Sequence, residues 1–225
     1  MGQDVLSENR KFQRGLSPER AARLVAVSDF QNKIFEKNTG LQAAHVVPWG
    51  VNGAEISSVL PVERSLEVLG VGSLLSVKNW EKWLRVIALA KKTFPNLQAE
   101  LIGDGPERTK LEQFALKLGL SGNIRFAGDL PRPEVLARMR KAKILLHTAD
   151  FESFGYVLAE AARAGCRVVS TPVGIAPELG AVAENIEDLA RLVAEDLQQP
   201  IEEHSFAPFT MEKTAEAYLR LYSKK

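Results

Sequence analysis

The stretch ADFESFGYVLAEAARAG, residues 149–165, contributes most to the fold prediction for this chain. Seven residues separate Glu152 from Glu160, and a Phe-Gly pair follows the first acid closely. Ser153 precedes an apolar run with helical spacing, which predicts that it caps a helix beginning near Phe154. Glu152 would then lie just before this helix, and Glu160 would lie in its second turn.

The spacing of these two acids indicates a long ligand. Eight residues at helical rise would separate the carboxylates by roughly 12 Å along the axis. Paired carboxylates of glycosidases lie about 5–10 Å apart, so the spacing is not obviously that of a hydrolase. A nucleotide-sugar suits it better, with one acid on the sugar and the other on the ribose. The N–H groups and the positive end of the helix would face the diphosphate.

Composition narrows the class of protein. A chain of 225 residues, 45% apolar and 25% charged, is typical of a soluble globular protein with one large domain or two small ones. A net charge of +1 gives no reason to expect a nucleic acid as the main partner. The single cysteine, the lack of a membrane-length apolar run and the lack of a signal-sequence core favour a cytoplasmic location. Peripheral membrane contact stays open.

Beyond Gly40, short β-rich runs alternate with amphipathic stretches, which predicts βαβ units and a parallel sheet. The expected strands cover residues 66–71, 97–102, 124–126, 143–147 and 167–170. Beside the helix after Ser153, the expected helices cover residues 80–93, 133–140, 186–197 and 211–222.

The two acids resemble the E-x(7)-E signature of retaining, nucleotide-sugar-dependent glycosyltransferases with the GT-B fold, those grouped as glycosyltransferase family 4. Four segments occur in that family's order and near its spacing: LEVLGVGSLLSVKNWEKWL, AELIGDGPERTKLEQFALKLGL, NIRFAGDLPRPEVLARMRKAKILLHTADFESFG and RVVSTPVGIAPEL. The resemblance implies an α/β fold, a Rossmann-like parallel sheet with helices on both faces.

The resemblance also implies a division of the chain. Residues 1–47 resemble the end of the family's N-terminal, acceptor-binding domain, with a helix capped by Ser28. Residues 48–52 resemble the hinge, and residues 53–225 the nucleotide-sugar-binding domain. The bulk of the first domain, where the family has its acceptor site and catalytic histidine, would then be a missing part or a partner chain.

Individual residues receive roles from the same comparison. Glu152 would lie beside the sugar hydroxyls, Glu160 would bind the ribose, and Lys78 would contact the diphosphate from the carboxyl edge of the sheet. Glu152 and Lys78 are the expected catalytic residues. The expected donor site comprises Gly72, Ser73, Lys78, Gly128, Asp129, Leu130, Glu152, Phe154, Gly155, Tyr156, Val157 and Glu160.

The chain also departs from the family pattern. Ser73 stands where the family has an arginine on the phosphates, which predicts weaker donor binding or a basic group supplied elsewhere. Ile175 replaces the second glycine of a GGxxE loop ending at Glu178, and the segment after that loop is shortened. His147 stands where the family often has proline, and we interpret it as a packing residue at a strand end.

The resemblance implies a retaining hexosyltransferase that moves a sugar from a nucleotide-diphosphate sugar to a hydroxyl of a carbohydrate or lipid-linked acceptor. It implies no metal and no further cofactor, and the sequence has no Asp-x-Asp motif. We expect the isolated chain to be inactive. One alternative is a non-catalytic nucleotide-sugar-binding or regulatory module, and another is a sugar epimerase of the same architecture.

Overall fold

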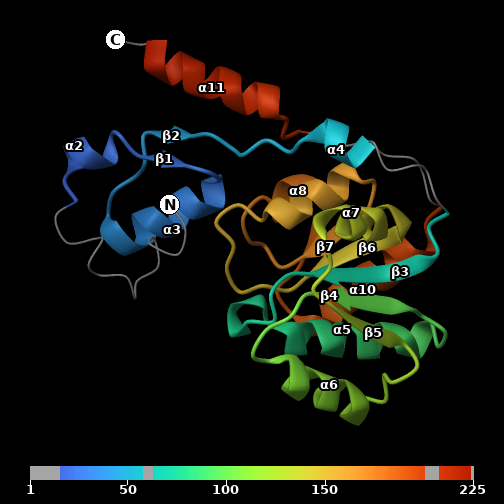
Figure 1. Ribbon diagram of the computed structural model, residues 1–225. Coiled ribbons are helices and arrows are strands. Elements are labelled where there is room, and N and C mark those ends of the chain that lie inside the picture. The colour runs from blue at the N-terminus through green and yellow to red at the C-terminus, as the bar shows by residue number, and fades with distance from the viewer. Residues whose placement is uncertain (1–15, 58–62, 201–207, 224–225) are drawn as a thin grey trace.

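The computed structural model describes residues 16–57, 63–200 and 208–223, and the part of the expected first domain at residues 1–15 lies outside these ranges. The described residues form a small lobe and a larger α/β unit (Figure 1). The small lobe holds a two-stranded parallel sheet, β1 (Val25–Ala26) and β2 (His45–Val46). Its helices are α2 (Pro18–Ala21) and α3 (Asp29–Thr39).

The larger unit is built on a six-stranded parallel sheet with the strand order β5-β4-β3-β6-β7-β8. These strands are β3 (Leu66–Val71), β4 (Ala99–Ile102), β5 (Ile124–Gly128), β6 (Ala142–His147), β7 (Arg167–Ser170) and β8 (Ala181–Val182). Because β4, β6 and β7 are buried almost throughout, their sequences are mainly apolar. The order confirms the Rossmann-like α/β prediction.

Helices cover both faces of this sheet (Figure 1). The sheet separates the hydrophobic core into two clusters. One face carries α4 (Gly53–Ser57), α7 (Arg132–Lys141), α8 (Tyr156–Arg163) and α9 (Ala176–Leu179). The other carries α5 (Trp80–Thr93), α6 (Arg108–Lys117) and α10 (Ile186–Gln198). Neighbouring strand residues alternate between the clusters, as Val68 and Leu69 do, since successive side chains point to opposite faces.

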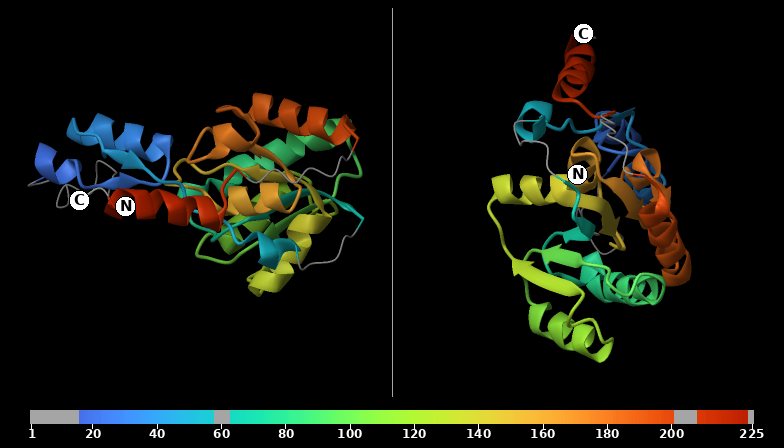
Figure 2. Two further views of the ribbon diagram at one scale, coloured as in Figure 1. Left: turned by 90° about the horizontal axis from the view of Figure 1, so that it is seen from above. Right: turned by 90° about the vertical axis from the view of Figure 1, so that its right-hand side faces the viewer.

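The last helix, α11 (Met211–Ser223), returns from the larger unit to the small lobe (Figure 2). Thr210 pairs with Val51, and the Thr214 hydroxyl donates to the Pro48 carbonyl over 2.8 Å. The predicted hinge therefore lies against the start of α11. None of the described helices is both long enough and apolar enough to cross a lipid bilayer.

The sequence-based element predictions are confirmed for β3, α5 and β7, and the other bounds differ by a few residues at most. The predicted strand at residues 97–102 begins only at Ala99, because its pairing with the neighbouring strand starts there, opposite Val68. The helix after Ser153 also begins two residues later than predicted, and this difference affects the site.

Candidate functional site

The two central strands, β3 and β6, lie side by side where the order of the sheet reverses. Ligands of open α/β sheets bind in the crevice at the carboxyl ends of such strands. The chain after β3 leads through the short 3-10 helix η2 (Ser76–Lys78) to Lys78, and the chain after β6 leads to Glu152. The backbone N–H of Asp150 donates to the Val77 carbonyl over 2.9 Å, which joins the two loops. The fold therefore brings together residues that are 74 positions apart.

Lys78 and Glu152 form an ion pair in this crevice, with side chains 19% and 16% exposed. The Nε2 atom of the buried His147 lies 3.2 Å from Oε1 of Glu152, but no described residue is aligned to hydrogen-bond it. Burial opposes ionisation of Glu152, yet the neighbouring imidazole and the Lys78 ammonium outweigh it and hold the pKa of Glu152 below its usual value. Glu152 is therefore an anion at neutral pH.

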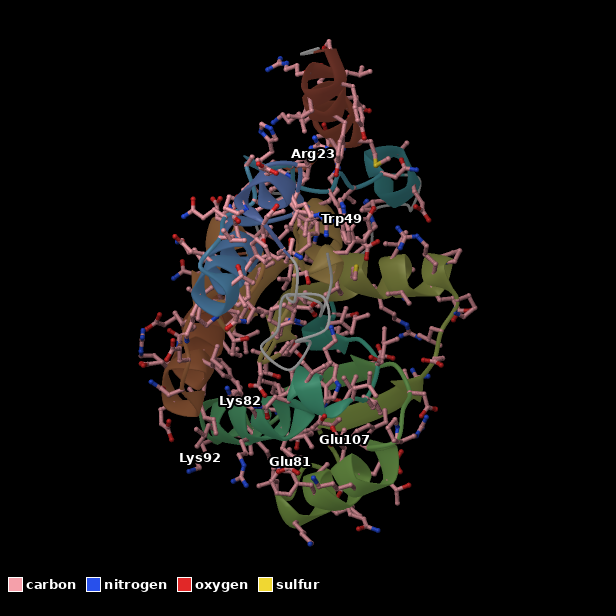
Figure 3. All side chains as sticks on the ribbon, turned by 90° about the vertical axis from the view of Figure 1, so that its left-hand side faces the viewer. Arg23, Trp49, Glu81, Lys82, Lys92 and Glu107 are labelled. Carbon is pink, nitrogen blue, oxygen red and sulfur yellow. The ribbon has the colours of Figure 1, made fainter. Side chains whose placement is uncertain are left out.

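A cavity of about 460 Å³ opens beside this ion pair. Six of the predicted donor-site residues line it: Ser73, Lys78, Glu152, Phe154, Gly155 and Tyr156. Trp49, Leu75, Val77, Phe151 and Ser153 complete the lining. Trp49, labelled in Figure 3, comes from the predicted hinge, is 43% exposed and has its ring centroid 5.7 Å from that of Phe154.

The predicted helix start near Phe154 is wrong, since α8 begins at Tyr156 and Ser153 does not cap it. Gly155 occupies the cap position with φ of +85°, a left-handed conformation that favours glycine. Phe154 is held outside the helix because its buried ring packs against Trp49, Tyr156 and Phe209. The N–H groups at the very start of a helix have no carbonyl one turn earlier to bond, so the start of α8 can receive an anion.

The small lobe supports the loop that carries Glu152. The buried Ser28 hydroxyl accepts from the Gln31 N–H at the start of α3 and donates to the Ser153 carbonyl over 2.5 Å. The ring centroid of Phe30 lies 5.9 Å from that of Phe151. The loop therefore rests on residues more than a hundred positions earlier in the chain.

Glu160 lies on α8 in a different environment from Glu152. Its side chain is 8% exposed, and its Oε1 atom lies 2.5 Å from Nη1 of Arg132 on α7. Nε and Nη2 of the same guanidinium donate to the carboxylate of Glu55 on α4, over 2.7 and 3.1 Å. Burial raises the pKa of Glu160, and Arg132 only partly offsets this effect.

Other predicted donor-site residues lie outside the cavity lining. Gly72 follows β3, and its N–H donates to the Ile102 carbonyl over 3.0 Å. Gly128 ends β5 with φ of +71°, and its carbonyl accepts from the Gly103 N–H. Asp129 and Leu130 continue from it toward α7, and Val157 lies half-buried on α8. None of these five residues is among those that line the cavity beside Glu152.

Two of the departures from the family pattern, Ser73 and Ile175, have structural counterparts. Ser73 is exposed, and its carbonyl accepts from the Trp80 indole N–H over 2.9 Å. Ile175 is fully buried, and its N–H donates to the Phe154 carbonyl over 2.9 Å. A side chain at Gly174 would place Cβ 2.2 Å from that carbonyl, so this loop packs its backbone directly against the site.

A second hollow of about 370 Å³ is lined in part by Ala149 and Asp150 of the loop that precedes Glu152. Phe30, Lys82, Asp150 and Glu184 contribute to its lining, but Lys82 is engaged with Asp150 at 3.9 Å and with the Glu184 carbonyl at 3.4 Å. Among the residues that the structure describes, no group of three or more His, Cys, Asp or Glu side chains is arranged to hold a metal ion.

Comparison with known proteins identifies the family. The description "Glycosyl transferases group 1" belongs to the family profile that matches residues 54–210. The chain is a member of this glycosyltransferase family. The match begins just after the predicted hinge and contains Lys78, Glu152 and Glu160.

The curated relatives of this glycosyltransferase chain are longer proteins. The phosphatidylinositol N-acetylglucosaminyltransferase gpi3 subunit of Schizosaccharomyces pombe is 32% identical over 114 residues, which are 51% of this chain and 25% of the relative. The 2-deoxystreptamine glucosyltransferase of Streptomyces kanamyceticus is 29% identical over 149 residues, 63% of this chain and 38% of the relative. The matched part of the chain thus spans less than half the length of either.

Solved structures show the same fold. Anabaena Alr3699/HepE in complex with UDP and glucose superposes with a TM-score of 0.74 at 20% identity, over 97% of this chain and 68% of that one. The six-stranded sheet with its flanking helices is therefore the Rossmann-like unit of a GT-B glycosyltransferase.

Sequence reasoning missed Arg132 and underrated His147. Arg132 is one of many charged residues in LPRPEVLARMRK, and no spacing rule connects it with an acid 28 positions later. His147 ends a buried strand, as predicted, but it also faces Glu152. His147 lies two residues before Ala149, where the loop that carries Glu152 starts. This closeness in sequence was the available signal that the two side chains could meet.

Proposed function

We propose that this chain is the donor-binding half of a retaining glycosyltransferase that uses nucleotide-diphosphate sugars. The observation that carries the proposal is the arrangement at the switch point of the sheet. Lys78 and Glu152 line a cavity there, α8 begins beside it with Tyr156 in the lining, and Glu160 lies one turn further along that helix.

In this proposal each group acts on a different part of the donor. Glu152 accepts hydrogen bonds from sugar hydroxyls, and Glu160 accepts them from the vicinal hydroxyls of the ribose. The N-terminus of α8 and the Lys78 ammonium stabilise the charge that develops on the departing diphosphate. The acceptor hydroxyl attacks from the face that the leaving group vacates, and the reaction needs no metal ion.

The relatives support a sugar donor without fixing its identity. Both named relatives are glycosyltransferases, one an N-acetylglucosaminyltransferase subunit and one a glucosyltransferase, and the Anabaena structure contains UDP and glucose. The proposal covers a hexose donor, a carbohydrate or lipid-linked acceptor and a cytoplasmic location. The proposal assigns the acceptor site to an N-terminal domain like that of the family. We therefore expect this chain alone to transfer little sugar.

Isothermal calorimetry with UDP-, GDP- and ADP-sugars tests the proposal. We expect the sugars of one of these three nucleotides to bind. Glu160→Ala should weaken that binding by at least tenfold, because charge-assisted hydrogen bonds contribute about 1.5–3 kcal/mol. Addition of EDTA should leave this binding unchanged. If no nucleotide-sugar binds, or if binding is insensitive to Glu160→Ala, the proposal fails.

A non-catalytic nucleotide-sugar-binding module is a second candidate, and Ser73 favours it. The cavity beside Glu152 has Lys78 as the only cationic side chain among its described lining residues, where the family pattern implies two cations. A transfer assay with an added N-terminal half from a related enzyme separates the two candidates. Turnover supports the transferase, whereas donor binding without turnover supports the module.

A further inference from the structure

Three charged side chains from three helices meet beside the expected ribose position. Arg132 at the start of α7 contacts Glu160 of α8 and, through two hydrogen bonds, Glu55 of α4. Glu160 is nearly buried, whereas the Arg132 side chain is 45% exposed. The guanidinium therefore connects a buried acid with a surface acid.

The contact between Arg132 and Glu160 is an ion pair without hydrogen-bond alignment. The buried Oε1 atom of Glu160 has no aligned hydrogen-bond partner among the described residues, although Nη1 of Arg132 lies 2.5 Å away. The guanidinium directs its aligned hydrogen bonds to Glu55 instead. The positive charge thus lies beside the buried oxygen of Glu160. Because an ionised carboxylate can accept several hydrogen bonds, the second oxygen, Oε2, keeps acceptor capacity for hydroxyl groups.

We propose that Arg132 is the positioning residue of the ribose site: it keeps Glu160 charged and oriented for vicinal hydroxyls, and Glu55 holds Arg132 in place. This inference rests on the proposed function, because it assumes that Glu160 binds a ribose. A buried carboxylate without a compensating charge takes up a proton, and a protonated carboxyl has less capacity to accept hydrogen bonds from a diol. Arg132 prevents that loss.

The charged and titratable groups facing Glu160 set the expected pH dependence. Arg132 of α7 lowers the pKa of Glu160, whereas burial and Glu55 of α4 raise it. Tyr156, one turn earlier on α8, has its own pKa raised by burial and by Glu160, and it stays neutral. Removal of Arg132 therefore raises the pKa of Glu160 further, and ribose binding should then require a higher pH.

The first experiment measures the ionisation of Glu160 in the full chain without ligand, by carboxyl ¹³C NMR titration. Glu160→Gln assigns the signal. We expect Glu160 to titrate at a higher pH in Arg132→Met than in the wild type, and Arg132→Lys to restore most of the difference. Arg191→Met is the matched control, because Arg191 also contacts two carboxylates, Asp188 and Glu195, on α10, which packs on the other face of the sheet. An unchanged Glu160 titration in Arg132→Met would overturn the inference.

The second experiment measures binding of UDP, GDP and ADP and of their 2′-deoxy forms across a pH series. We expect Arg132→Met to weaken ribonucleotide binding by about tenfold at the acidic end, with recovery as pH rises. The 2′-deoxy forms should be affected less. If the wild type binds no nucleotide, the proposed function and the ribose role fail together. Normal wild-type binding with an unshifted pH profile in Arg132→Met would overturn only the role of Arg132.

Discussion

Glu152 and Glu160 come from one short signature, yet they occupy opposite electrostatic environments. Glu152 lies on a loop with Lys78 and His147 beside it, and these neighbours lower its pKa despite burial. Glu160 lies on a helix with a single guanidinium that is shared with Glu55, and burial raises its pKa. The spacing of two acids thus places them along the backbone, whereas partners distant in sequence decide their charge.

The largest expected effect comes from removing the buried ring of Phe154, which lies two residues after Glu152. Phe154→Ala should destabilise the protein by about 3–5 kcal/mol, because it opens a cavity among Trp49, Tyr156 and Phe209. Urea denaturation measures the change. Leu116→Ala is the control, since Leu116 is 62% exposed. A loss below about 1 kcal/mol for Phe154→Ala would mean that this aromatic cluster does not hold the site together.

Glu152→Gln should destabilise the free protein by about 2 kcal/mol at pH 7, because Lys78 loses its partner in a partly buried site. A lowered pKa means that ionised Glu152 stabilises the fold above the unfolded-state pKa. This contribution is lost as pH falls through the folded-state pKa, so the difference from wild type should vanish in acid. Urea denaturation at several pH values measures it, with the surface variant Glu81→Gln as control. Equal stability of Glu152→Gln and wild type at pH 7 would contradict this account.

Ser28→Ala should destabilise the protein by about 1 kcal/mol, since it removes a helix cap and the hydrogen bond to Ser153. Ser17→Ala provides a matched control, because Ser17 caps α2, a different helix of the small lobe. We expect only Ser28→Ala to weaken binding that depends on the sugar moiety. Calorimetry measures the donor affinity of both variants. If Ser28→Ala and Ser17→Ala bind the donor equally well, the small lobe does not support the loop that carries Glu152.

Glu160→Gln should have the smallest effect on stability. Unlike the three preceding variants, it should stabilise the protein, by about 0.5 kcal/mol at pH 7. A raised pKa means that ionising Glu160 in the folded state is unfavourable, and this penalty applies above the folded-state pKa and disappears below the unfolded-state pKa. The gain should therefore decline as pH falls. Thermal denaturation at pH 7 and in acid checks the sign, and a clear loss at pH 7 would contradict it.

Much of the fold could be predicted because it depends on local pattern. The bounds of β3, α5 and β7 followed from apolar runs and helical periodicity, and the order of alternating elements indicated a parallel sheet. The start of α8 could not be predicted in the same way. Ser153 is a good cap by local preference, but Gly155 and the buried Phe154 ring determine where the helix begins.

The candidate site was predictable only in part, for a similar reason. Lys78 and Glu152 were both expected to bind the donor, and the fold places them in contact. The partnership of Arg132 with Glu160 depends on how α7 packs beside α8, and the support from Ser28 depends on how the small lobe packs on the loop. Neither contact leaves a periodic or spacing signal in the sequence.

In the proposed function, Glu152 binds the sugar and Glu160 binds the ribose. Calorimetry with two ligands and two variants tests this assignment directly. The ligands are the nucleotide-sugar that binds the wild type and its nucleoside diphosphate; the variants are Glu152→Gln and Glu160→Gln. We expect Glu160→Gln to weaken both ligands equally, and Glu152→Gln to remove only the additional affinity contributed by the sugar. Equal weakening of both ligands by both variants would contradict the account.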